Sequence, residues 1–119
     1  MSSSLFAVAF DCADATSLAR FWADVLGRRV GEDSTSEHAV LLAGDGDTSG
    51  GPRMTFNKVP EPKVVKNRLH LDLISDTFDA ETERLLSLGA QRLRDVQGTK
   101  VRWTTFADIE GNEFDLIAG

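Results

Sequence analysis

The sequence predicts an α+β fold of two successive βαβββ modules, with both helices packed outside the sheets. The order strand, helix and three strands can be read twice along the chain, and each expected helix ends at a Leu-Gly pair, at 26–27 and 88–89. At 119 residues the chain is too short for two independently stable domains. We therefore expect one domain over residues 1–119, with repeat halves at about 5–58 and 67–119 that share one core.

The first half opens with a short apolar run at 6–11, which predicts a buried strand. Asp14 is a suitable N-cap for the helix that follows, and Gly27 suits its left-handed C-terminal position. An apolar stripe at helical spacing predicts the buried side of this helix: Leu18, Phe21, Trp22, Val25 and Leu26. Further strands are expected at 29–32, 38–43 and 53–57, with a glycine-rich loop at 44–51.

The second half repeats this order. A strand at 68–74 precedes a helix at 77–88, which is capped by Asp76 or Thr77 and stopped by Gly89. The inner side of this helix is expected to carry Phe78, Thr82, Leu85 and Leu86. Strands follow at 90–96, 101–107 and 112–117. The Leu-Gly pairs give a repeat offset of 62, whereas matching the strand faces suggests 63.

Composition and charge exclude several classes of protein. Hydrophobic residues make up 41% of the chain and charged residues 27%, as in globular proteins. The net charge of −6 disfavours nucleic acid as a partner, and no apolar run is long enough to span a membrane. The first six residues do not resemble a secretory signal, and Cys12 is the only cysteine, so we expect a cytoplasmic protein without disulfides.

The stretch 66–73 combines a packing pattern with chemically active side chains. Alternation places Leu69, Leu71 and Leu73 on one face of the expected strand, and Arg68, His70 and Asp72 on the other. The first face would pack in the core, and the second would carry a polar site. His70 is the residue around which we expect that site to be built.

Several of these features together resemble a known superfamily. They are the duplicated βαβββ order, the aromatic helix ending at Leu26-Gly27, His70 in the fifth strand, and the segment 108–112 before the last strand. In these four features the chain resembles the vicinal oxygen chelate superfamily, which includes glyoxalase I, bleomycin-resistance proteins and extradiol dioxygenases. It is most similar to the small glyoxalase-like domain proteins. The resemblance implies a U-shaped mixed sheet around a central cleft, and a homodimer.

The resemblance also implies where a divalent metal would bind. Metal-dependent members take ligands from the first and last strand of each half, and His70 and Asp115 match two of these positions. A third position falls on Ala7 or Val8, and the fourth falls in 53–56, which offers no ligand. Two protein ligands hold an ion weakly, so we expect no tight metal site. If a divalent metal is a cofactor, His70 and Asp115 would bind it.

Further candidates follow from alternation in the last strands. Trp103 and Thr105 share one face of their strand, and a tryptophan there would form an aromatic wall for a flat ligand. His70 and Asp115 are the candidates for catalysis, because Asp115 could accept one N–H of the imidazole and leave the other nitrogen as a base. The expected ligand-binding set is His70, Asp72, Trp103, Thr105, Glu113 and Asp115.

Two functions of different class remain open. The first is a glyoxalase-like protein that binds a small organic molecule in a cavity without a complete metal site. The alternative is a metal-dependent lyase, isomerase or dioxygenase, in which the ion would polarise a carbonyl group. A structural or regulatory domain with a filled cavity is a third reading. Whether the protein is an enzyme stays open, and glyoxalase I activity itself is not expected.

Overall fold

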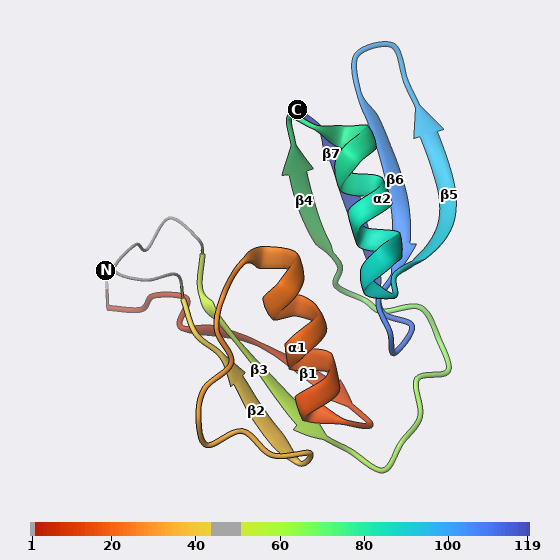
Figure 1. The fold of residues 1–119 in the computed structure, drawn as a ribbon. Coiled ribbons are helices and arrows are strands. Elements are labelled where there is room, and N and C mark those ends of the chain that lie inside the picture. The colour runs from red at the N-terminus through yellow and green to blue at the C-terminus, as the bar shows by residue number, and fades with distance from the viewer. Residues whose placement is uncertain (1, 44–50) are drawn as a thin grey trace. The chain divides into compact units, whose positions relative to one another are not determined.

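The computed structural model describes residues 2–43 and 51–119, which divide into two compact units, unit 1 (1–62) and unit 2 (63–119) (Figure 1). Most of the glycine-rich loop expected at 44–51 lies outside the described residues. Among the helices in the described ranges, none is long and apolar enough to cross a membrane.

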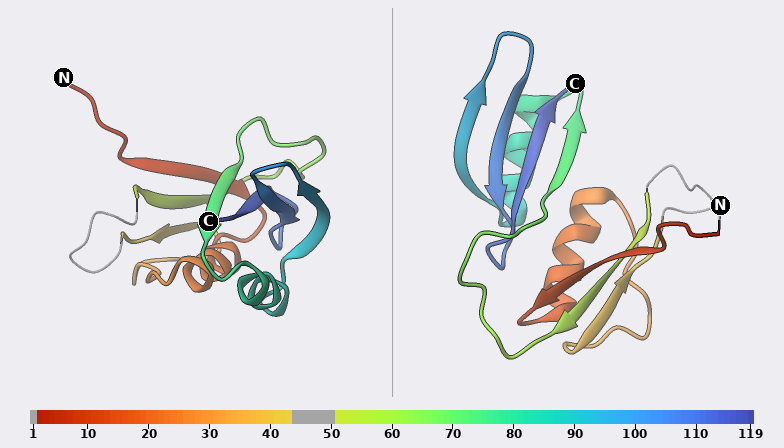
Figure 2. Two further views of the ribbon diagram at one scale, coloured as in Figure 1. Left: turned by 90° about the horizontal axis from the view of Figure 1, so that it is seen from above. Right: turned by 180° about the vertical axis from the view of Figure 1, so that it is seen from behind.

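Unit 1 contains one helix and a three-stranded mixed sheet. Its elements are β1 (Ala7–Cys12), α1 (Ala15–Leu26), β2 (His38–Leu41) and β3 (Arg53–Lys58). The strand order is β1-β3-β2, in which β1 runs parallel to β3 and β2 antiparallel to it. Helix α1 lies along one face of this sheet (Figures 1 and 2).

Helix α1 begins and ends as its sequence predicts. The side chain of Asp14 accepts a hydrogen bond from the Ser17 N–H, and Gly27 adopts a left-handed conformation with φ of 66°. Trp22 is fully buried, which confirms its expected place in the core, and Cys12 is a buried packing residue. The apolar stripe therefore faces the sheet, as its spacing indicates.

Two strand predictions in unit 1 were too long. The strand expected at 29–32 is reduced to a single bridge between Val30 and Leu41, and the strand expected at 38–43 ends at Leu41. Gly31 still donates its N–H to the Val40 carbonyl, but it has no side chain to pack on the sheet. The segment therefore stays at the sheet edge without forming a ladder.

Unit 2 contains a four-stranded mixed sheet covered by one helix. Its elements are β4 (Leu71–Ser75), α2 (Phe78–Leu88), β5 (Gln91–Gln97), β6 (Arg102–Ala107) and β7 (Glu113–Ala118). The order β4-β7-β6-β5 repeats the order β1-β3-β2 of unit 1, with the Val30 bridge in the place of β5. The chain is thus an α+β protein with two mixed sheets, consistent with two βαβββ modules.

The first strand of unit 2 was predicted to begin too early. It was expected at 68–74, but β4 begins at Leu71, and Leu69 is 67% exposed instead of packing in the core. The Asn67 side chain explains this difference: it donates to the Leu69 carbonyl and accepts the N–H of Glu113. An amide side chain therefore occupies groups that a strand would use for its ladder.

The core of unit 2 lies between helix α2 and the four-stranded sheet. Phe78, Thr82 and Leu85 are buried, as predicted, and Leu86 is half-buried. Thr77 is the N-cap position but makes no side-chain capping bond, whereas Gly89 ends the helix with φ of 111°. On the sheet, the fully buried side chains Thr104, Phe106, Phe114 and Leu116 alternate with the residues of the opposite face.

The turn between β6 and β7 is built around a buried carboxylate. Asp108 is 4% exposed and accepts hydrogen bonds from the backbone N–H groups of Glu110 and Asn112. Its two oxygens also accept from the Asn112 side chain. Gly111 completes the turn with φ of 87°. The turn fixes where β7 begins.

We expect the Asp108→Ala variant to lose about 2–3 kcal/mol of unfolding free energy, because the partly buried N–H groups of Glu110 and Asn112 lose the buried carboxylate that accepts their hydrogen bonds. Urea unfolding followed by circular dichroism measures this loss. The exposed Glu83→Ala change on α2 is the control, and we expect it to stay within about 0.5 kcal/mol of the parent. A loss as small as the control's would show that the turn does not depend on Asp108.

Candidate functional site

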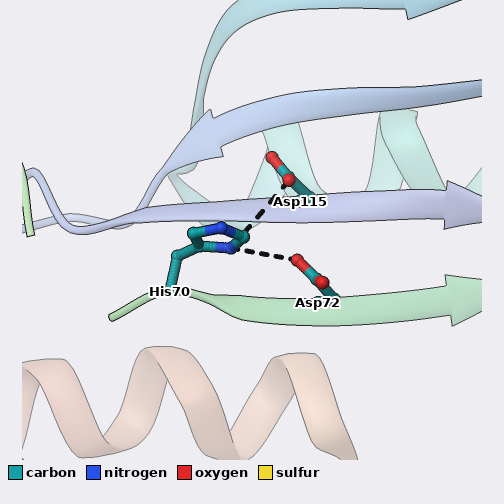
Figure 3. A group of neighbouring side chains, drawn as sticks. All are labelled: His70, Asp72 and Asp115. Atoms are coloured by element: carbon teal, nitrogen blue, oxygen red, sulfur yellow. Dashed lines mark ion pairs between the residues drawn. The ribbon is translucent and has the colours of Figure 1, made fainter. Parts of the chain in front are cut away.

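An imidazole and two carboxylates meet on the face of the unit 2 sheet opposite α2 (Figure 3). His70 lies directly before β4, and its Nδ1 is 3.0 Å from Asp72 Oδ1 and 3.9 Å from Asp115 Oδ2. One ligand atom from each residue lies within 4.8 Å of the others. The other oxygen of Asp115 accepts a 2.6 Å hydrogen bond from the Thr105 hydroxyl. We refer to His70, Asp72 and Asp115 as the His-Asp-Asp cluster.

The register of the sheet explains this meeting. Asp72 is the parallel partner of Asp115, Asp115 is the antiparallel partner of Thr105, and Thr105 is the partner of Arg94. These four residues form one polar row across four strands. Because partners on neighbouring strands lie about 4.8 Å apart on the same face, their side chains stand side by side.

An apolar row runs beside the polar row on the same face. Two residues away on each of these strands, toward the same side of the polar row, the register pairs Ile74 with Ile117, Ile117 with Trp103, and Trp103 with Val96. Side chains two residues apart share a face and are separated by about 7 Å along the strand. The face therefore combines a charged strip with a parallel hydrophobic strip.

Burial differs strongly between members of the two rows. Thr105 is 3% exposed, and the Asp115 side chain is 20% exposed, so both lie low in the site. The side chains of His70 and Asp72 are 44% and 52% exposed, and Ile74 is 73% exposed. The β4 side of this face is thus open to solvent, whereas its β6 and β7 positions are more enclosed.

A third carboxylate on this face has cationic neighbours. Glu113 lies two residues before Asp115, and its oxygens are 3.8 Å from Lys66 Nζ and 3.5 Å from Arg94 Nη1. Its backbone N–H is bonded to Asn67, which thereby fastens the segment before His70 to β7. Two cations share one carboxylate here, so this end of the face has the opposite charge balance to the His-Asp-Asp cluster.

The cluster can act on protons or hold a cation. When Nδ1 of His70 carries the proton it donates to Asp72, and Nε2 is left with a lone pair that can accept a proton. When Nδ1 is unprotonated, its lone pair and the oxygens of the two carboxylates can act as metal ligands, and zinc, manganese, nickel and iron bind ligands of this kind. Asp72 therefore adds a third donor to the two counted from the sequence, His70 and Asp115.

Unit 1 offers no matching donors at the equivalent positions. The starts of the helices, Ala15 and Phe78, are 63 positions apart, and this offset places Ala7 opposite His70. The parallel pair formed by Ala9 and Thr55 in unit 1 takes the place of Asp72 and Asp115. This offset favours Ala7 over Val8 as the counterpart of His70, whereas the helix ends, Leu26 and Leu88, are 62 positions apart; neither alanine nor valine can bind a metal.

The structure brings most of the expected site residues onto one face. His70, Asp72 and Asp115 form the cluster, Thr105 is bonded to Asp115, and half-buried Trp103 lies in the neighbouring apolar row. Glu113 shares the face but pairs with two cations. Sequence reasoning placed Ile117 on this face with Asp115, but it missed three kinds of neighbour: the cations Lys66 and Arg94, the amide of Asn67, and the apolar residues Ile74 and Val96.

The residues that were missed left little signal in the sequence. A register shift between Arg92 and Arg94 interrupts the alternation of β5, so the face on which Arg94 lies cannot be read from a period of two.

On the opposite side of this strand, the hydroxyl of Thr104 and then the guanidinium of Arg92 lower the pKa of Asp95. This acid therefore supports the strand and takes no part in the cluster.

Comparison with known proteins places this fold in a family. A model of the glyoxalase-like domain family matches residues 7–117. None of the curated proteins matches the sequence. Among solved structures, a glyoxalase/bleomycin resistance protein/dioxygenase family enzyme from Burkholderia phytofirmans has a TM-score of 0.77 at 17% identity, covering 98% of each chain.

Fosfomycin resistance proteins are also structurally similar. A mutant of FosX from Listeria monocytogenes, solved with Mn(II) and 1S,2S-dihydroxypropylphosphonic acid, has a TM-score of 0.78 at 19% identity and covers 100% of this chain and 92% of its own. FosX from Mesorhizobium loti has a TM-score of 0.71 at 20% identity, with coverage of 100% and 93%. At these identities the likeness shows the fold alone. The family match over residues 7–117 shows that the chain belongs to the glyoxalase-like domain family, and the solved structures share its fold.

Proposed function

We propose that the protein binds a small organic molecule on the face of the unit 2 sheet that carries the polar and apolar rows, without needing a metal. The observation that carries this proposal is the apolar row beside the His-Asp-Asp cluster, in which Ile74 is 73% exposed and Trp103 is half-buried. Ligand sites combine an apolar surface with a few placed polar groups, and this face has both.

Within this proposal the six residues expected from the sequence have distinct roles. Trp103 offers its ring to a flat part of the ligand, while Asp72 and Asp115 accept hydrogen bonds from its polar edge. Thr105 holds one oxygen of Asp115 in place, and His70 orients the ligand or takes a proton from it. Glu113 holds Lys66 and Arg94 at the edge of the face.

A second candidate function is a metal-dependent lyase, isomerase or dioxygenase. The specific observation in its favour is the third donor, Asp72, because three protein ligands and a water are a common set for catalytic metals. Such an ion would supply Lewis-acid chemistry, and the chain's own residues would orient the substrate. The FosX structure with Mn(II) makes manganese a reasonable first ion to test.

A fragment screen by ¹H–¹⁵N NMR separates the two candidates. Under the proposed function, fragments shift the amides of β6 and β7 and the indole N–H of Trp103 in the presence of EDTA. The buried indole of Trp22 in unit 1 is the internal control. Hits that need Mn²⁺, with paramagnetic broadening centred on His70, Asp72 and Asp115, would support the metal-dependent candidate instead.

We also propose that the protein is a homodimer. The first segment of unit 2 exposes three large apolar side chains, Val64, Val65 and Leu69, and burial against a second copy would remove them from water. We expect light scattering to give twice the chain mass, and the Val64→Ser/Val65→Ser variant to shift the mass toward that of one chain. A single-chain mass for the parent across micromolar concentrations would contradict the dimer.

A further inference from the structure

The polar row on this face has an uneven charge. Asp72 and Asp115 stand on neighbouring strands, whereas Arg94 stands two strands from Asp115 and is paired with Glu113. Even a protonated His70 neutralises only one of the two carboxylates. The cluster therefore keeps at least one net negative charge in either state of the imidazole.

The two carboxylates have free capacity to accept hydrogen bonds. Thr105 donates to Asp115 Oδ1, and His70 Nδ1 lies 3.0 Å from Asp72 Oδ1 but 3.9 Å from Asp115 Oδ2, so each carboxylate has an oxygen that can accept a further hydrogen bond. Parallel partners lie about 4.8 Å apart, a spacing at which one ammonium group can donate to both. An alcohol could form similar bonds but would leave the negative charge uncompensated.

The apolar row indicates that the other part of the ligand is apolar. Ile74, Ile117 and Trp103 follow one another across three strands, about 7 Å from the carboxylates along the strand direction. A ring lying on this row can be joined to an ammonium over the carboxylates by a few methylene groups. Trp103 adds an aromatic face that also attracts a cation.

From this charge complementarity we infer that the ligand is an amphipathic amine, with an apolar body on the Ile74, Ile117 and Trp103 row and its ammonium on Asp72 and Asp115. The inference rests on the proposed function, because it names the class of ligand for the same face. The cations Lys66 and Arg94 lie at the other end, where they would repel the ammonium, so the amine has one preferred orientation.

Three probes of matched size test the inference in the presence of EDTA: 4-phenylbutylamine, 4-phenylbutanol and 4-phenylbutyrate. We expect the amine to bind at least 10-fold more tightly than the alcohol, and the carboxylate more weakly than both, as read from the shift of the Trp103 indole N–H. Asp72→Asn should bring the affinity for the amine close to that for the alcohol, because the amide keeps an acceptor oxygen but carries no charge. Asp79→Asn, the same change on α2, is the matched control and should alter neither.

Other outcomes overturn the inference in distinguishable ways. Equal binding of all three probes, a preference for the carboxylate, or an unchanged amine-to-alcohol ratio in Asp72→Asn would remove the preference for a cation while the proposed binding face stands. If none of the three moves the Trp103 indole, the inference fails. If, in addition, no fragment shifts that indole in the screen, the proposed function fails as well.

Discussion

The Phe114→Ala variant is expected to lose about 3–4 kcal/mol of unfolding free energy, the largest stability effect we predict for a single residue. Phe114 is 1% exposed on the strand β7, which is paired on both sides, by β4 and β6. Its ring stacks on Phe106 with centroids 5.6 Å apart and planes 19° apart. Truncation would leave a cavity that neither neighbouring strand can close without breaking its ladder. Urea unfolding followed by circular dichroism measures the loss.

Phe6→Ala is the matched control for Phe114→Ala. Phe6 is 70% exposed before β1, and the guanidinium of Arg53 lies 4.5 Å from the centroid of its ring. We expect this change to cost under about 1 kcal/mol, because little surface returns to water. Equal losses in the two variants would show that the core of unit 2 does not depend on β7.

The sequence predicted the fold best where local chemistry decides the structure. Asp14, Gly27 and Gly89 mark helix ends through a cap or a left-handed backbone, and those ends were predicted correctly. The strand boundaries were less predictable, because pairing with a distant segment decides them. Val30 forms one bridge where a strand was expected, since its neighbour Gly31 contributes no side chain to a packed face.

The start of β4 shows how a single distant contact changes a local pattern. The alternation over 68–73 was regular enough to predict a strand, but the Asn67 amide joins the Leu69 carbonyl to the N–H of Glu113. Glu113 is 46 positions away along the chain. No local pattern reports such a bond. As a result, His70 lies before the strand, close enough to both Asp72 and Asp115 to contact them.

The candidate site could be predicted only in part, because pairing between strands decides some of its members. Alternation placed Asp72 beside His70, and the resemblance to a family indicated Asp115. The cross-strand register then decided which residues complete the two rows, and register cannot be read from one strand alone. Because the register of β5 shifts between Arg92 and Arg94, periodicity could not show that Arg94 belongs to the polar row.

The two units show that the scaffold and the chemistry of the site are separable. The Ala9–Thr55 pair of unit 1 has the same place in its sheet as the Asp72–Asp115 pair of unit 2, and Ala7 has the place of His70. Alanine and threonine form the corresponding strand pair in unit 1 without any acid. The carboxylates of unit 2 are therefore not needed for the sheet to form, which is consistent with a role in binding.

That separation leads to the prediction for His70→Ala. We expect this variant to weaken binding of 4-phenylbutylamine at least 5-fold, because the imidazole orients Asp72 and borders Asp115 on the open side of the site. Its unfolding free energy should stay within about 0.5 kcal/mol of the parent, since the side chain is 44% exposed and lies outside every strand. Titration of the Trp103 indole signal and urea unfolding measure the two quantities on one sample.

His38→Ala is the matched control, because His38 is also exposed and also bonded to a polar side chain, with Nδ1 2.7 Å from Asn57 Oδ1, but lies in unit 1. We expect it to leave the affinity for the amine unchanged. A His70→Ala variant that binds the amine as tightly as the parent would exclude the imidazole from the site. A loss of several kcal/mol in unfolding free energy would instead show that His70 holds β4 and β7 together, and that the cluster is part of the fold of unit 2.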